Sequence, residues 1–142
     1  MEAESIQINT TKEKFFLEYL TLKRPIINAI LTKINGRKTV LNDIPMRVLA
    51  ELLFLNDKYS DLPDDKKWTI IFSPESREYV TKKLRMEKHY LYVYFTQLRK
   101  IKVLNGKKIN KLFIVNAVDH DLSFKFVLNG QDGKQVDKKD DA

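Results

Sequence analysis

Residues 84–104 read LRMEKHYLYVYFTQLRKIKVL, and the fold depends on how this stretch is built. Leu91, Phe95 and Leu98 recur at the three- and four-residue spacing that places side chains on one face of an α-helix. We therefore predict a helix from His89 to Ile101 that buries these three side chains. The letters YLYVYF within it also have high β-propensity, so a strand is the alternative interpretation.

Upstream of this stretch, apolar residues at helical spacing predict helices that begin near Thr11, Pro25 and Pro45. The run WTIIF at Trp68–Phe72 favours a short strand. The dipeptide Ser73–Pro74 then predicts the beginning of another helix, because a hydroxyl N-cap followed by proline is a preferred helix start.

Downstream, the signals favour strands. Asn105-Gly106 is a hairpin-turn dipeptide, and the run LFIV at Leu112–Val115 is suited to the strand that follows such a turn. A further strand is expected at Ser123–Leu128, where SFKFVL alternates.

From Pro45 onward this order of elements resembles the winged helix-turn-helix family. At the two apolar turn positions of that family this chain has Leu84 and Met86, and Val103 stands where the wing begins. The resemblance covers Pro45 to Val115. It implies an α+β, mainly α fold of helix, strand, helix, helix and hairpin, with an N-terminal helical extension and a C-terminal strand.

We accordingly expect five segments along the chain. They are a flexible N-terminus at residues 1–10, a helical extension at 11–41, a winged helix-turn-helix domain at 42–117, a strand at 118–129 and a polar tail at 130–142.

The sequence departs from the family pattern around the expected recognition helix. Glu87 stands at the capping position, Arg85 replaces the small turn residue, and Lys102 replaces the common glycine before the wing. Tyr92 and Val93 make the expected reading face partly apolar, whereas helices that read bases usually present polar side chains.

Positive charge is concentrated in one part of the chain. The formal net charge of the 142 residues is +7. Residues 73–112 hold eleven Lys or Arg and three Glu, a net +8, while the rest holds fifteen basic and sixteen acidic residues, a net −1. A segregated basic segment favours a polyanionic partner, and double-stranded DNA is the first to consider.

The resemblance implies the residues that would contact DNA. Those expected to face the bases are Lys88, His89, Tyr92, Val93, Thr96 and Gln97. Those expected to contact the backbone are Lys82, Lys83, Arg85, Lys100, Lys107, Lys108 and Lys111. The expected function is therefore non-enzymatic DNA binding, as an accessory in regulation, replication or packaging.

A structural or assembly protein is the alternative hypothesis. An exposed pair such as Tyr92 and Val93 more often marks a protein contact, so protein partners or a homo-oligomer through this face and the termini are also considered. The Lys-, Ile- and Asn-rich chain resembles small phage-encoded winged-helix proteins, including those of crAss-like phages. That resemblance implies a virion component.

Catalytic and metal sites are not expected, and no cofactor is predicted. The chain has no cysteine, which excludes thiolate chemistry and sulfur-ligated zinc. Asp119-His120-Asp121 contains ligand residue types, but three adjacent residues cannot all face one ion, so a solvated turn is predicted. No stretch is apolar enough for a membrane span, so the expected location is the cytoplasm, or a virion if the chain is phage-encoded.

Overall fold

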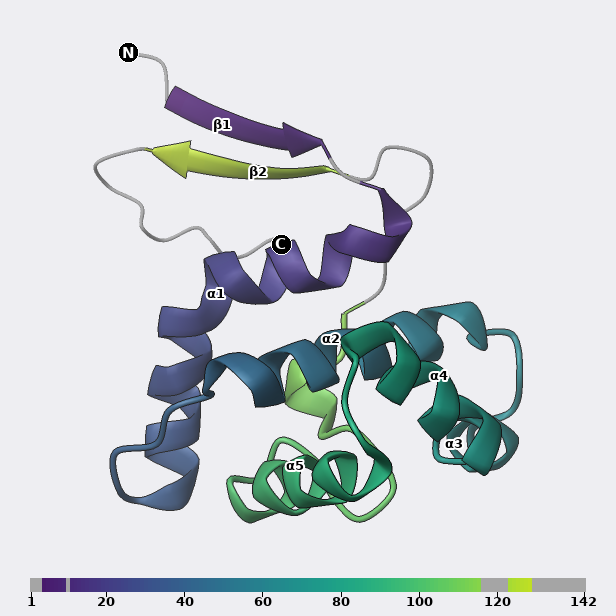
Figure 1. The fold of residues 1–142 in the computed structure, drawn as a ribbon. Coiled ribbons are helices and arrows are strands. Elements are labelled where there is room, and N and C mark those ends of the chain that lie inside the picture. Colours follow the sequence, from purple (N-terminus) through teal and green to yellow (C-terminus); the bar gives the residue numbers. More distant parts are fainter. Residues whose placement is uncertain (1–3, 10, 116–122, 129–142) are drawn as a thin grey trace. The chain divides into compact units, whose positions relative to one another are not determined.

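The computed structural model describes residues 4–9, 11–115 and 123–128, which belong to two separate units (Figure 1). In one unit, strands β1 (Glu4–Asn9) and β2 (Ser123–Leu128) form an antiparallel pair in which Ile6 lies opposite Phe126. The strand at Ser123–Leu128 matches the prediction, whereas β1 was not predicted. The expected polar tail at 130–142 lies outside the described residues.

The second unit is helical. Its elements are α1 (Lys12–Asn35), α2 (Asp43–Lys58), α3 (Asp64–Ile71), α4 (Pro74–Leu84), α5 (Lys88–Lys100) and the short 3₁₀-helix η1 (Lys111–Phe113).

Helix α2 lies at the centre of this unit. It contacts α1, α3, α4 and α5, and Figure 1 shows it running between α1 and the helices that follow it. Val48, Leu49, Leu52 and Leu53 of α2 are inaccessible to solvent. A helix that is apolar on several faces has to be covered by other elements, and the four amphipathic helices around α2 provide that cover.

Helix α1 continues through Pro25, where the sequence predicted the start of a second helix. Proline cannot donate the backbone hydrogen bond of a helix interior, and Figure 1 shows α1 changing direction part-way along its length. The helix is not interrupted because both of its halves are buried, through Phe16 and Leu20 before the proline and Ile27 and Leu31 after it.

The predicted strand at Trp68–Phe72 is wrong, since these residues belong to α3 and its C-terminal cap. A helix places Trp68 and Ile71 on the same face, and both are buried there. Asp64 and Asp65 lie in the first turn, where carboxylates interact favourably with the helix dipole. The burial of one face therefore outweighs the β-propensity of this short run.

The predicted hairpin after α5 is also wrong. Between residues 101 and 115, all of them described, the structure has an isolated bridge between Leu104 and Ile109 and no β-strand. The run Leu112–Val115, predicted as a strand, begins within η1 instead. Successive residues Val103 and Leu104 are both buried, so the alternation that a two-stranded wing requires is missing.

These findings overturn the winged helix-turn-helix assignment. Residues 11–115 form a helical unit with an irregular loop after α5, in place of the expected α+β domain with a hairpin. The predicted start of α4 and the predicted buried face of α5 are confirmed. Ser73 caps α4 by accepting a hydrogen bond from the backbone N–H of Ser76 at 3.3 Å. Helix α5 replaces the alternative strand, with Leu91, Phe95 and Leu98 buried as predicted.

Replacing Phe95 by alanine tests this packing. The Phe95 ring is 2% exposed and lies edge-on to Phe72, with 5.3 Å between the ring centroids. Phe95→Ala should lower the free energy of unfolding by about 3–5 kcal/mol, because it leaves a cavity in the core. Urea denaturation measures the loss, with Thr96→Ala on the exposed side of α5 as the control. Equal midpoints for Phe95→Ala and the wild type would contradict the burial of α5.

Candidate nucleic-acid interface

The turn between α4 and α5 is closed by a basic residue in a left-handed conformation. Arg85 has φ 56° and ψ 49°, and the N–H of Met86 donates to the carbonyl of Thr81 at 3.0 Å. This is the usual hydrogen bonding of a helix end at which glycine is preferred. Here the position holds an exposed arginine at the entrance to α5.

A second left-handed basic residue follows the other end of α5. Lys102 has φ 71°, and the N–H of Val103 donates to the carbonyl of Leu98 at 2.9 Å. Both departures from the family pattern, at the small turn residue for Arg85 and at the common glycine for Lys102, are thus located at helix ends. A left-handed non-glycine residue costs about 1–2 kcal/mol, so the surrounding contacts must hold each one in place.

Side-chain hydrogen bonds fix the loop after α5. Arg99 donates from Nε to the carbonyl of Gly106 at 3.0 Å, and Asn110 donates from Nδ2 to the carbonyl of Lys102 at 2.9 Å. Asn35 of α1 donates to the carbonyl of Ile101 at 3.0 Å. Burial in the core also holds the loop in place. Its buried apolar residues are Val103, Leu104, Ile109 and Phe113.

The outward face of α5 combines polar and apolar side chains. His89, Thr96 and Gln97 are exposed, as are Tyr92 and Val93 at 45% and 46%. The centroid of the Tyr92 ring lies 5.5 Å from the guanidinium carbon of Arg77 on α4. The residues expected to face bases therefore occupy the solvent-exposed part of this helix.

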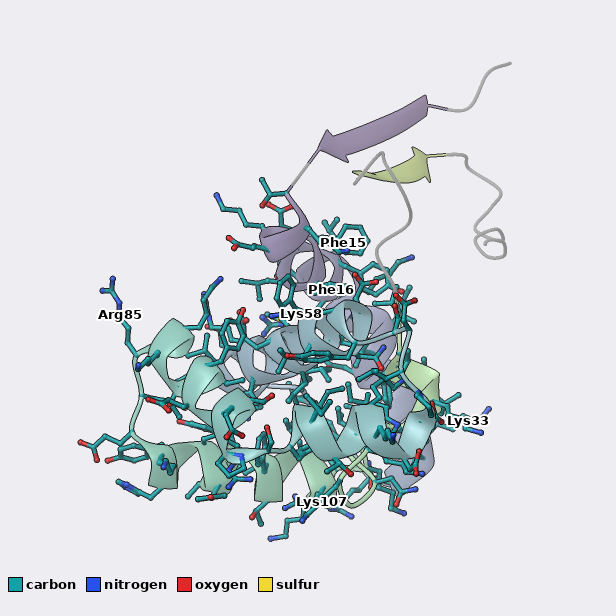
Figure 2. The ribbon with its side chains drawn as sticks, turned by 90° about the vertical axis from the view of Figure 1, so that its right-hand side faces the viewer. Phe15, Phe16, Lys33, Lys58, Arg85 and Lys107 are labelled. Atoms are coloured by element: carbon teal, nitrogen blue, oxygen red, sulfur yellow. The ribbon has the colours of Figure 1, made fainter. Side chains whose placement is uncertain are left out.

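The residues expected to contact the DNA backbone are all exposed, and they lie at the two ends of α5. Figure 2 shows Arg85 and Lys107 in the loops that precede and follow the helix. The remaining members of the set are Lys82, Lys83, Lys100, Lys108 and Lys111. Lys88, which was expected to face the bases, is also exposed and is the first residue of α5. The structure adds Arg99 and Lys102, which sequence reasoning did not assign although both lie within the basic segment.

Few of these charges are neutralised locally. Lys82 pairs with Glu78 at 3.2 Å, and Lys83 approaches Glu13 at 4.0 Å. The other basic residues of this set form no ion pair with any residue the structure describes. Their positive potential is therefore available to an external anion.

The loop after α5 borders two hollows. The first, of about 630 Å³, lies against α3 and is lined by Asp64, Asp65, Trp68, Thr69, Lys107 and Lys108. The second, of about 640 Å³, is lined by the polar and charged residues Arg99, Lys102, Asn105, Lys108, Asn110 and Lys111, and also by Leu104, Gly106 and Ile109. We call the second one the basic hollow.

One titratable pair lies away from this surface. The Tyr79 hydroxyl of α4 donates to Oε1 of Glu51 on α2 at 3.1 Å. Burial raises the pKa of Glu51, and the hydrogen bond from Tyr79 and the charge of Lys83 partly offset that rise. Burial and the neighbouring carboxylate also raise the pKa of Tyr79. The pair joins α2 to α4 and borders neither hollow.

Within residues 11–115 and the two strands, no group of three or more His, Asp or Glu is placed to hold a metal ion. Asp119-His120-Asp121 lies outside the described residues. No helix in the described ranges combines the length and apolar content that a bilayer span requires.

The pH dependence of stability tests the Glu51 environment. The pKa of Glu51 is raised in the folded state. At a pH between its ordinary pKa and the raised pKa, Glu51 is therefore protonated in the folded chain and ionised in the unfolded chain. Its contribution to stability therefore falls as pH rises from the ordinary value through the raised one. Glu51→Gln should stabilise the protein relative to wild type more at pH 7 than at pH 4, as measured by thermal unfolding. Glu75→Gln on α4 controls for the change in net charge, and a pH-independent difference for Glu51→Gln would contradict the burial of its charge.

Comparison with known proteins adds no relative: no protein-family model, curated protein or solved structure matches this chain.

Proposed function

We propose that this chain binds double-stranded DNA, without catalysing a reaction, through α5 and the loops at its two ends. The observation that carries the proposal is the arrangement of exposed cations around one exposed helix. Arg85 and Lys88 lie at its beginning, and Lys100, Lys107 and Lys111 lie at its end or in the loop that follows. None of these five is neutralised by a described carboxylate.

The dimensions suit a helix in the major groove. An α-helix with its side chains is about 10–12 Å across, and the major groove of B-DNA is about 12 Å wide. With α5 in the groove, cations at its two ends would face phosphates on opposite sides. Backbone contacts of this kind would hold the protein in register on the duplex.

Base preference would come from the centre of the helix. Thr96 and Gln97 carry hydrogen-bonding groups on the exposed face, and Gln is suited to the edge of adenine. Val93 would contact a thymine methyl group. Glu87 opposes binding, because its exposed carboxylate precedes α5 and would repel the phosphates of DNA. This carboxylate lies 3.5 Å from the imidazole Nδ1 of His89.

The salt dependence of duplex binding tests the contribution of the loop after α5. Replacing Lys107, Lys108 and Lys111 together by glutamine should flatten the plot of log affinity against log salt by up to about 3 units, since each phosphate contact contributes about 0.9. Fluorescence anisotropy with a labelled duplex measures the slope. The matched control replaces three exposed lysines of α1 and α2, at positions 14, 33 and 58, and should leave most of the slope intact. An unchanged slope in the loop variant would contradict the proposal.

Protein assembly through the same helix is the second candidate. It is favoured by the exposure of Tyr90 at 49%, together with that of Tyr92 and Val93, because large exposed apolar groups are common in protein interfaces. The surrounding cations favour DNA over this candidate, since a second copy of the chain would bring like charges together. An assembly partner would need an acidic surface.

A double substitution separates the two candidates. With α5 in a DNA groove, replacing Tyr92 and Val93 by serine should weaken duplex binding by ~1–3 kcal/mol and leave self-association unchanged. In a protein interface the same change removes a desolvated anchor and should cost about 2 kcal/mol or more of association. Duplex titration and sedimentation velocity on the same variant measure both. Loss of self-association with unaltered duplex affinity would favour assembly.

A further inference from the structure

The basic hollow gathers four cations from the last turn of α5, the loop after it and η1. Arg99 comes from the last turn of α5, Lys102 from the left-handed position after it, and Lys108 and Lys111 from the far side of the loop. No acidic side chain lines the hollow among the described residues. Like charges held this close repel each other, and a bound anion would relieve that repulsion.

The guanidinium of Arg99 and the backbone of Lys102 are held in position before any ligand arrives. The bond from Arg99 Nε to the Gly106 carbonyl orients the guanidinium and leaves its terminal amino groups available. The backbone of Lys102 has a left-handed conformation, and its carbonyl accepts a hydrogen bond from Asn110. Preorganised donors lose little conformational entropy when a ligand binds, which favours a specific site over diffuse attraction.

The end of a helix normally disfavours anions, because its last carbonyl groups carry partial negative charge. Here most of those groups already accept hydrogen bonds. The carbonyls of Leu98 and Arg99 accept hydrogen bonds from the loop backbone, and that of Ile101 accepts one from Asn35. The backbone N–H groups of Gly106 and Lys108, in contrast, donate no hydrogen bond to any described residue. The carbonyls of Leu104, Asn105 and Ile109 likewise accept no hydrogen bond from a described residue, so the excess of donors at this hollow comes from the side chains of the four cations.

We propose that the basic hollow is a phosphate-binding site, with Arg99, Lys102 and Lys111 as its principal ligands. Guanidinium and ammonium groups with no opposing carboxylate match the charge and the acceptor oxygens of a phosphate. The identification of that phosphate as a phosphodiester of a DNA backbone rests on the proposed function. A free oligophosphate has the same chemistry, and the experiment separates the two sources.

Titration of the full chain with tripolyphosphate at low ionic strength tests the site, with calorimetry as the readout. Wild type should bind one equivalent. Lys102→Gly and Lys111→Gln should each weaken binding by about tenfold, as expected for the loss of one hydrogen bond to a charged group. Lys33→Gln on α1 is the control, because this exposed lysine lines neither hollow and lies outside the proposed DNA-binding surface. Its effect should stay below about twofold.

Lys102→Gly also keeps the test independent of folding. Glycine adopts a φ of 71° without strain, so this variant should melt no lower than wild type while it loses the ligand. Equal weakening by all three substitutions would show diffuse attraction and overturn the site, as would no weakening by either Lys102→Gly or Lys111→Gln.

Competition between tripolyphosphate and a duplex identifies the source of the phosphate. Tripolyphosphate that displaces the duplex from wild type, and much less from Lys102→Gly, supports a backbone phosphate in the hollow. Specific tripolyphosphate binding without any duplex binding supports the phosphate site and refutes the proposed function. Duplex binding that is insensitive to Lys102→Gly and Lys111→Gln overturns the inferred backbone contact and leaves the rest of the proposed function standing.

Discussion

The burial of α2 is the constraint on which the helical unit depends. Leu49, Leu52 and Leu53 of this helix have no contact with water, and α1, α3, α4 and α5 all pack against it. Each surrounding helix must turn its apolar side inward and its polar side outward. The outward direction of α5 follows from this requirement, because Leu91, Phe95 and Leu98 occupy the inner side. The candidate interface is thus a consequence of how the core is covered.

Two strained helix ends hold α5 in this position. Arg85 and Lys102 adopt left-handed backbone conformations that glycine would adopt at lower cost. Their hydrogen-bonded turns are followed closely by residues that are buried or partly buried, Met86 after the first and Val103 after the second. The contacts of those residues offset the local strain. As a result, two exposed cations have defined backbone positions at opposite ends of one helix.

The charge distribution gives the chain two kinds of electrostatic environment. Between α2 and α4, the cost of burying the Glu51 carboxylate is partly offset by a hydrogen bond from Tyr79 and by the nearby charge of Lys83. Around the loop after α5, Arg99, Lys102 and their neighbours have no such partner among the described residues. A folded chain tolerates the second arrangement because exposed charges are screened by water and salt. The first arrangement is typical of packing, whereas the second is typical of a surface that meets an anion.

The sequence by itself determined those features that depend on nearby residues. The spacing of Leu91, Phe95 and Leu98 predicted α5 and its inner face, Ser73 and Pro74 predicted the start of α4, and residue counts located the basic segment. Periodicity, capping and charge are local properties, so they can be deduced without knowledge of the fold. The exposure of the candidate site residues followed from the same helical register.

Tertiary structure alone decided the rest. Trp68–Phe72 is too short for periodicity to distinguish a strand from a helix, and the burial of Trp68 and Ile71 on one face selects the helix. The chain bends after Asn105, but four residues separate the bridged Leu104 and Ile109, and Val103 and Leu104 are both buried, so no two-residue hairpin forms. The pairing of β1 with β2 joins opposite ends of the chain, which no local pattern can reveal. The basic hollow likewise exists because hydrogen bonds from Asn110 and Arg99 bring separate parts of the loop together, and such contacts form only once the core beneath them is packed.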